Sequence, residues 1–169
     1  MMETRIYRRV RRNRKKGTVP LSKLRTSEAV KTVVAHPRRM EELVGLLEDR
    51  DRILRGRAAV ALARLSESHP GRLLRTLERI KYCLSDDSAY VRWHLCYTLG
   101  CLGKRFPGKA PRLVADLGSH LDDDNRIVRV FAAGALARIG ALNQDAVQSF
   151  FQAAKREIPS SISKILGKQ

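Results

Sequence analysis

Apolar and polar residues alternate along this chain with the period of an α-helix, and the whole pattern returns every 37 residues. Leu47, Leu84 and Leu121 mark the period, because each opens a short acidic stretch between two apolar series. Residues three or four positions apart share one face of a helix, so each series predicts a helix with one apolar side. The apolar positions after the acidic stretches are Leu54, Ala58, Leu62 and Leu65, then Val91, Leu95, Leu99 and Leu102, then Val128, Ala132, Leu136 and Ile139.

Another apolar series precedes each acidic stretch, so the predicted unit is helix, turn, helix. At the last turn position lie Asp51, Ser88 and Asn125, whose short side chains can accept hydrogen bonds from the free N–H groups of a starting helix. We expect all three to be N-caps. Gly103 and Gly140 are expected at the ends of two of the helices that follow, where a left-handed residue is favoured. The preceding series are Met40, Leu43 and Leu47, then Leu77, Ile80 and Leu84, then Val114, Leu117 and Leu121, and the pattern is continued by Phe151, Ala154 and Ile158.

A repeat of this size, built from two one-sided helices, is typical of an α-solenoid. The stretch from Leu121 to Gly140 reads Leu-x-Asp-x-x-x-x-Val-Arg-x-x-Ala-Ala-x-Ala-Leu-x-x-Ile-Gly and resembles the HEAT and HEAT-like families, including the bilin-lyase type. The resemblance covers roughly residues 37–166. It implies an all-α, right-handed α-solenoid of helix-turn-helix repeats.

The expected domain organisation has a basic N-terminal arm and one repeat domain, as suits a chain of 169 residues. Val147, Phe150 and Phe151 are expected to pack against the third repeat and so to close the core at that end. The predicted boundaries are 1–26 for the arm and 27–169 for the repeat domain, with repeats at about 37–69, 70–106 and 107–143 and a capping partial repeat at 144–169.

Composition excludes several classes of protein. No apolar run approaches the 18 or so residues of a membrane span, and the basic start lacks the apolar core of a signal peptide. A cytoplasmic location is therefore expected, with an organelle transit peptide as the alternative. Cys83, Cys96 and Cys101 form no C-x-x-C pair, so neither a disulfide nor a metal site is expected.

The net charge of +17 is concentrated near the start, because residues 1–35 hold 11 basic and 2 acidic residues. Such a dense block of like charge is expected to stay disordered until it meets a polyanion, most simply RNA or DNA. The alternatives are a solubilising tail, a localisation signal, or binding to acidic proteins or anionic lipid. The candidate nucleic-acid-binding residues of this arm are Arg5, Arg8, Arg9, Arg11, Arg12, Arg14, Lys15 and Lys16.

A second basic feature follows the repeat. Arg38, Arg75 and Arg112 are 37 residues apart, and so are Arg72 and Lys109. Equivalent positions stack when repeats pack, so these side chains predict a basic edge that would contact a nucleic-acid backbone. A solvated face that only keeps the repeats soluble is the alternative.

A further arginine row follows the acidic turns and is assigned a structural role. HEAT-like families pair an aspartate with an arginine within or between neighbouring repeats, and the resemblance implies the same here. The arginines are Arg55, Arg92 and Arg129, and the aspartates in register with them are Asp49, Asp86 and Asp123.

Tyr90, Trp93 and Tyr97 share one stripe of a predicted helix and are the candidate partner-binding residues. One interpretation is structural, with the Trp93 indole packed over the preceding helix where Gly56 leaves room. The other is an exposed patch on the inner surface, where the rings would anchor a partner protein or stack on unpaired bases.

No catalytic motif is found. The chain lacks a nucleotide-binding glycine loop, a G-x-S-x-G elbow and an H-E-x-x-H helix, and its four histidines are scattered. Some HEAT-like relatives are hydroxylases with His-Glu pairs, DNA glycosylases or bilin lyases, but this chain has no His-Glu dipeptide. The prediction is a non-catalytic binding module for a polyanion, without cofactor or small-molecule substrate. The alternatives are a protein-protein scaffold that uses the inner helices and, as an enzyme, a relative of the glycosylases or lyases.

Overall fold

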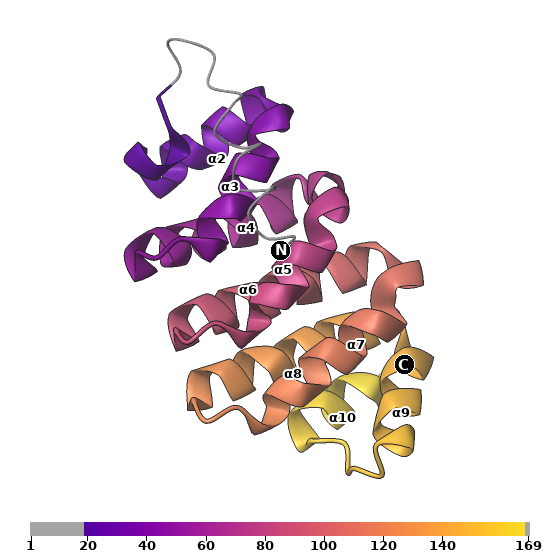
Figure 1. Ribbon diagram of the computed structural model, residues 1–169. Helices are drawn as coiled ribbons and strands as arrows, with labels where there is room; N and C mark the ends of the chain where they lie inside the picture. The colour runs from indigo at the N-terminus through magenta and orange to yellow at the C-terminus, as the bar shows by residue number, and fades with distance from the viewer. Residues whose placement is uncertain (1–18, 168–169) are drawn as a thin grey trace, which may run out of the picture.

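The computed structural model describes residues 19–167, and this part of the chain is helical without strands (Figure 1). The predicted arm residues from Arg5 to Lys16 lie outside the described residues. The α-helices are α2 (Thr26–Ala35), α3 (Met40–Gly45), α4 (Arg52–Ser68), α5 (Leu77–Tyr82), α6 (Ala89–Arg105), α7 (Ala110–Gly118), α8 (Arg126–Gly140), α9 (Gln144–Ala153) and α10 (Ser160–Leu166). Short 3₁₀ segments join them at Leu21–Lys23, Pro37–Arg39, Leu46–Glu48, Pro70–Thr76, Cys83–Ser85, Pro107–Lys109 and Ser119–Asp122.

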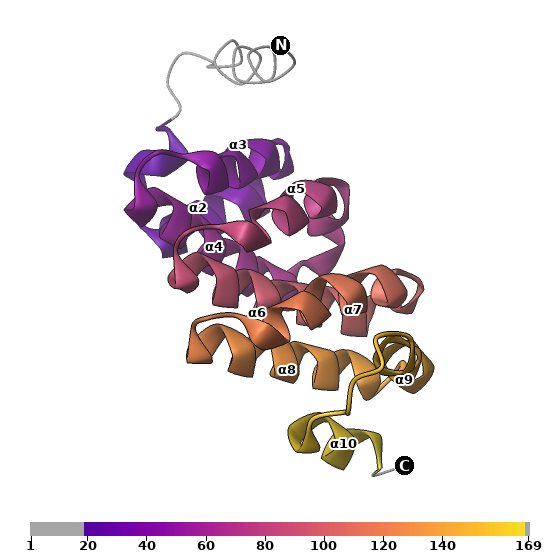
Figure 2. The same cartoon turned by 60° about the horizontal axis from the view of Figure 1, so that its bottom comes forward.

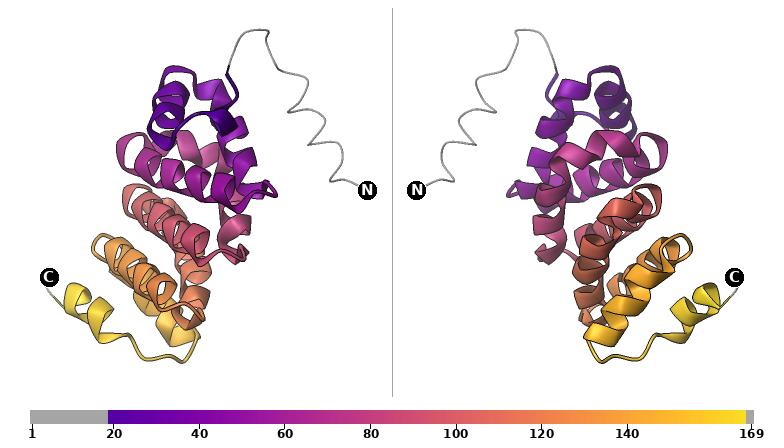
Figure 3. Two further views of the ribbon diagram at one scale, coloured as in Figure 1. Left: turned by 90° about the vertical axis from the view of Figure 1, so that its left-hand side faces the viewer. Right: turned by 90° about the vertical axis from the view of Figure 1, so that its right-hand side faces the viewer.

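The helices form two layers (Figures 1 and 2). One layer, called the long-helix layer below, contains α4, α6 and α8 side by side, with the shorter α2 and α10 at its two ends. The other layer, called the short-helix layer below, contains α3, α5, α7 and α9. The repeats follow one another in order from α2 to α10 (Figure 3), so the predicted all-α repeat solenoid is confirmed.

The core lies between the layers and contains nearly all of the predicted apolar positions. Leu62, Leu99 and Leu136, at the same place in three repeats, are fully buried. Of the others, Leu54, Leu121 and Ile158 are half-buried, and Ala154 is exposed. Ala154 was wrongly predicted as helical, because α9 ends at Ala153 and Lys155 then takes the left-handed conformation, at φ 50°.

Two of the three predicted N-caps are confirmed. The Asp51 carboxylate accepts a hydrogen bond from the Ile53 N–H, and the Asn125 side chain accepts from the Ile127 and Val128 N–H groups. Ser88 occupies the N-cap position of α6 without accepting such a bond, so its predicted role is wrong. Its backbone N–H instead donates to the carboxylate two residues earlier, and its side chain is buried.

Two glycines of α6 allow α8 to pack closely against it. Gly103 lies inside α6, where an added Cβ would come within 2.5 Å of Ile139 Cδ1, and one at Gly100 would lie 2.7 Å from Ala135 Cβ. Gly140 is the last residue of α8, as predicted, but neither Gly103 nor Gly140 has the left-handed conformation that was expected. Helix α6 runs past Gly103 and ends at Arg105. The next residue, Phe106, precedes Pro107, and the residue before a proline is disfavoured in the helical conformation.

Both ends of the described solenoid are closed by packed side chains. At the start, Leu21 is buried and its N–H donates to Glu42 Oε1 at 2.9 Å. At the far end Val147 and Phe151 are buried, and the Phe150 ring covers Gly118. In the part of the chain that the structure describes, no helix has the length and apolar character needed to cross a membrane.

Candidate binding surfaces

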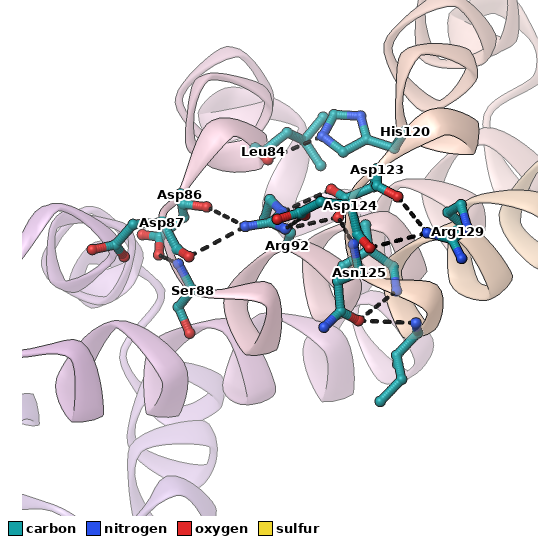
Figure 4. Close-up of polar contacts among 12 residues, drawn as sticks. Leu84, Asp86, Asp87, Ser88, Arg92, His120, Asp123, Asp124, Asn125 and Arg129 are labelled. Atoms are coloured by element: carbon teal, nitrogen blue, oxygen red, sulfur yellow. Dashed lines mark hydrogen bonds and ion pairs between the residues drawn. The ribbon is translucent and has the colours of Figure 1, made fainter.

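The first two arginines that follow the acidic turns, Arg55 and Arg92, lie between successive long helices, and Figure 4 shows the contacts of Arg92. Arg92 Nε and Nη2 donate to the two carboxylate oxygens of Asp123 at 2.8 and 2.7 Å, and Nη2 also reaches Asp124 Oδ1 at 2.6 Å. Its Nη1 donates to the Asp86 carbonyl of its own turn at 2.9 Å. The pair is well buried, with 12% of the Arg92 side chain and 7% of the Asp123 side chain exposed. One guanidinium therefore ties its own turn to the next repeat.

Arg55 is bound in the same way one repeat earlier. Its Nε donates to Asp86 Oδ2 at 2.7 Å, Nη2 contacts Asp87, and Nη1 donates to the Asp49 carbonyl at 3.1 Å. The predicted pairing is thus confirmed for two arginines, and it runs from each repeat to the one after it. Burial raises the pKa of Asp123, but hydrogen bonds to its carboxylate outweigh burial and hold the pKa at about 2.

Arg129, the third member of this row, lacks a carboxylate partner among the described residues. Its Nη1 donates to the carbonyls of Asp123 and Asp124 at 2.7 and 3.1 Å, as in the earlier repeats. The position 37 residues after Asp123 is Ser160, which carries no charge.

The aromatic stripe on α6 is divided between two neighbouring helices. The Tyr90 ring packs where Gly56 leaves room, since an added Cβ there would lie 3.1 Å from Tyr90 Cδ1. Trp93, which was expected at that place, instead stacks on His94 and packs against Phe131 of α8, with ring centroids 3.4 and 4.4 Å away. Trp93 is half-buried, so it contributes to the joint between α6 and α8.

Tyr97 also has partners on both sides. Its hydroxyl donates to the Glu67 carboxylate of α4, and the Arg138 guanidinium of α8 lies 4.3 Å from the centre of its ring. Its phenol is therefore held by both neighbours. Of the three aromatic candidates, Tyr90 is the most exposed.

The long-helix layer carries a row of exposed apolar side chains, of which the sequence analysis singled out only Tyr90. Ile53, Tyr90 and Ile127 are 37 residues apart, and 70%, 51% and 53% of their surfaces are exposed. The signal was present in the repeat, because all three follow their N-cap by two residues. The long helices α4, α6 and α8 are also basic, with ten lysines and arginines and one acidic residue, Glu67.

The predicted basic edge divides into exposed and engaged residues. Arg38, Arg75 and Arg112 are exposed, and none makes an ion pair within residues 19–167. Lys109 is also exposed, whereas Arg72 Nη1 donates to the carbonyls of Val33 and Val34 at 3.1 and 2.7 Å and so caps the end of α2. A groove of about 400 Å³ lies along this edge, and it is lined by His69, Pro70, Gly71, Arg72, Arg105 and Phe106.

Ion pairs on the short-helix layer were not foreseen. Arg79 bridges Glu41 and Glu48 of the preceding repeat at 3.2 and 2.7 Å. Lys81 contacts both Glu78 and Asp116, which belongs to the following repeat. No sequence signal marked these pairs, because they do not recur at the repeat period.

A sequence model described as HEAT repeats matches residues 76–162, a little over half of the chain. This chain belongs to the HEAT-repeat family. The HEAT resemblance of the 37-residue unit is thereby confirmed. No curated protein matches the sequence.

Several solved structures share the fold of this HEAT-repeat protein. A designed armadillo repeat protein in complex with the peptide (KR)4 is 18% identical, with a TM-score of 0.64 over 86% of this chain and 67% of that chain. An archaeal HEAT-like repeats protein from Thermococcus onnurineus NA1 is 19% identical, with a TM-score of 0.64. That match covers 99% of this chain, which spans 63% of the archaeal protein. At these identities the likeness concerns the fold alone.

The buried cysteine and histidine side chains of this HEAT-repeat protein have structural roles. Burial raises the pKa of Cys83 to about 11 and of Cys96 to about 12, which leaves both thiols protonated and unreactive. His94 is buried, burial lowers its pKa, and its Nδ1 donates to the Tyr90 carbonyl at 2.7 Å. Between residues 19 and 167, no group of three His, Cys, Asp or Glu side chains is arranged to hold a metal ion.

Proposed function

We propose that this protein is a non-catalytic scaffold whose long-helix layer binds an extended segment of a partner protein. The supporting observation is the row of Ile53, Tyr90 and Ile127, exposed at the same place in three repeats. Exposed apolar side chains that line up on one surface are typical of interaction sites, and tyrosine is enriched among the residues that dominate binding energy.

The positive charge of the long helices favours an acidic partner segment. The designed armadillo protein named above is in complex with a basic peptide. The long helices here carry one acidic residue and ten basic residues, of which Arg55 and Arg92 pair with carboxylates and eight remain. Packed helices lie about 8–10 Å apart, and a segment in the polyproline II conformation rises about 3.1 Å per residue and places every third side chain on one face. Successive apolar side chains of the bound segment should therefore be about three residues apart, with acidic residues between them.

A displayed library of random peptides, selected on the immobilised full chain, tests this function. We expect acidic peptides with spaced apolar residues, and we expect Tyr90→Ser to weaken their binding at least tenfold. Tyr82→Ser is the matched control, because Tyr82 is even more exposed, at 79%, but lies on α5 in the other layer. Selection of peptides without acidic residues, or equal losses in both variants, would contradict the proposal.

The second candidate function is binding of RNA or DNA along the basic edge. Arg38, Arg75 and Arg112 support it, because they are exposed in register without carboxylate partners in the described part of the chain. The candidate arm residues from Arg5 to Lys16 would add phosphate contacts that position the ligand without reading its sequence.

Titration of fluorescent RNA, duplex DNA and heparin across a salt series tests this candidate. Each lost contact to duplex DNA should reduce the slope of log affinity against log salt by about 0.9. We expect this for Arg75→Gln and Arg112→Gln, and a larger loss for a chain that begins at Thr18. The control Arg64→Gln removes an exposed arginine from the long-helix layer. Equal losses in all arginine variants, or equal binding of heparin, would show that the interaction depends only on net charge and not on the basic edge.

A further inference from the structure

The two joints between long helices are built from the same parts. In each joint an arginine of one repeat binds the acidic turn of the next repeat, as Arg55 binds Asp86 and Arg92 binds Asp123. Beside the ion pair lies an apolar contact, formed by Tyr90 over Gly56 in the first joint and by Trp93 against Phe131 in the second. In both joints, therefore, a turn that carries carboxylates and an apolar contact lie side by side.

The far edge of α8 carries the arginine of such a joint without the acidic turn. Arg129 Nη1 is fixed on the carbonyls of Asp123 and Asp124, as Arg92 Nη1 is fixed on the turn before it. In Arg92 the remaining Nε and Nη2 groups grip a carboxylate, whereas in Arg129 they have no partner within residues 19–167. Its own turn thus holds the guanidinium in the posture that binds a carboxylate in the other repeats.

The apolar surface at this edge of α8 is also uncovered. Val130 occupies the position of Trp93, and 59% of its surface is exposed. An added Cβ at Gly134 would meet nothing within 4 Å, whereas one at Gly140 would lie 2.7 Å from Leu166 of α10. The seven-residue α10 therefore covers only the second half of α8, and the first half lies open beyond its end (Figure 2).

We propose that Arg129, Val130 and Gly134 form a docking edge for a partner protein, whose segment begins with an acidic turn and continues as a short helix. The carboxylate would accept hydrogen bonds from both Nε and Nη2 of Arg129, the bidentate geometry that arginine favours. An apolar side chain of the partner's first helical turns would cover Val130, as Phe131 covers Trp93. The basic arm of this chain is a poor occupant, because it would bring a like charge to Arg129.

A peptide with the sequence of residues 119–133, in which only the part from residue 126 onward is held helical by a cross-link on its outer face, is a suitable probe because this segment docks on Arg92 and Trp93 within the chain. Fluorescence anisotropy with the full chain should show binding that Arg129→Gln weakens at least tenfold. The control Arg52→Gln removes the same charge from the first turn of α4, and it should leave the affinity within about twofold.

Two further variants keep the test decisive. Asparagines at peptide positions 123 and 124 should abolish binding, and Val130→Ser in the protein should weaken it several-fold. Circular dichroism should show that Arg129→Gln still melts cooperatively, since no buried carboxylate loses its partner. Absence of binding by the wild-type chain at millimolar peptide, or equal binding by Arg129→Gln, would overturn the proposal.

Discussion

Two rows of arginine recur every 37 residues in this protein, and they have opposite surroundings. Arg55 and Arg92 are enclosed by the carboxylates of the following repeat. Arg38, Arg75 and Arg112 are exposed. They lie at or just before the start of the short helices α3, α5 and α7. The rows are equally regular in sequence, so regularity alone does not distinguish a structural arginine from one that is available for binding.

The acidic turn makes the difference. A turn with two adjacent acidic residues precedes α6 and α8, and it lies beside the arginine of the repeat before it. The loops around Arg75 and Arg112 contain proline and glycine, and no carboxylate of residues 19–167 pairs with either side chain. An arginine becomes part of the structure where the neighbouring repeat supplies an anion.

The largest expected effect is that of Arg92→Ala. Removing one partner of a buried ion pair leaves the other charge uncompensated, which costs about 3–5 kcal/mol of unfolding free energy. Urea unfolding followed by circular dichroism measures this cost. A loss below about 1 kcal/mol would show that Asp123 reaches solvent or another cation, and the contrast between the rows would fail.

Acid should expose the same contrast in the unmodified protein. The pKa of Asp123 is held at about 2, below its ordinary 3.8, so its stabilising effect is complete above that ordinary value. Stability should therefore fall as the pH drops from about 4 towards 2, where the carboxylate takes up a proton. Urea midpoints across this range should fall less steeply in Arg92→Gln, which has already lost the pair. Parallel curves would assign the acid sensitivity to other groups.

Arg129→Gln sharpens the comparison within one row. This arginine holds two turn carbonyls but no carboxylate, so its loss should cost only about 1 kcal/mol, the value of ordinary hydrogen bonds. The same urea experiment measures it beside Arg92→Ala. A cost as large as that of Arg92→Ala would reveal a partner for Arg129 in the folded chain.

The smallest expected effect on stability is that of Arg75→Gln. Exposed positions without special contacts usually change unfolding free energy by less than about 0.5 kcal/mol. The thermal midpoint should therefore match that of the wild type. A clear drop would place Arg75 with the structural arginines and remove it from the candidate nucleic-acid edge.

The repeat period was enough to predict the fold, because burying one-sided helices leaves few solutions. The register of charges also marked Arg92 and Asp123 as members of two matching rows, but only the structure shows that the pairing runs from one repeat to the next. The direction of Trp93 could not be predicted, because the indole could turn towards either neighbouring helix. The Phe131 ring that it contacts has His94 and Arg57 at its equivalent positions, so no repeated signal marked it.

The candidate surfaces were only partly predictable. Exposure of Arg75 and Arg112 followed from their place near the start of a short helix, but the capping role of Arg72 depends on where the preceding helix ends. The row of Ile53, Tyr90 and Ile127 was hidden for another reason. Its members fit a helical stripe as well as core residues do, and only the packing shows that no layer covers them.

The double attachment of the turn arginines gives the solenoid a direction. Nη1 of Arg55 and Arg92 binds the turn of its own repeat, whereas the carboxylate it needs belongs to residues made later in synthesis. Each repeat therefore supplies the carboxylates for an arginine of the repeat made before it. Assembly from the N-terminal end can proceed one repeat at a time, with every completed unit serving as a template for the next.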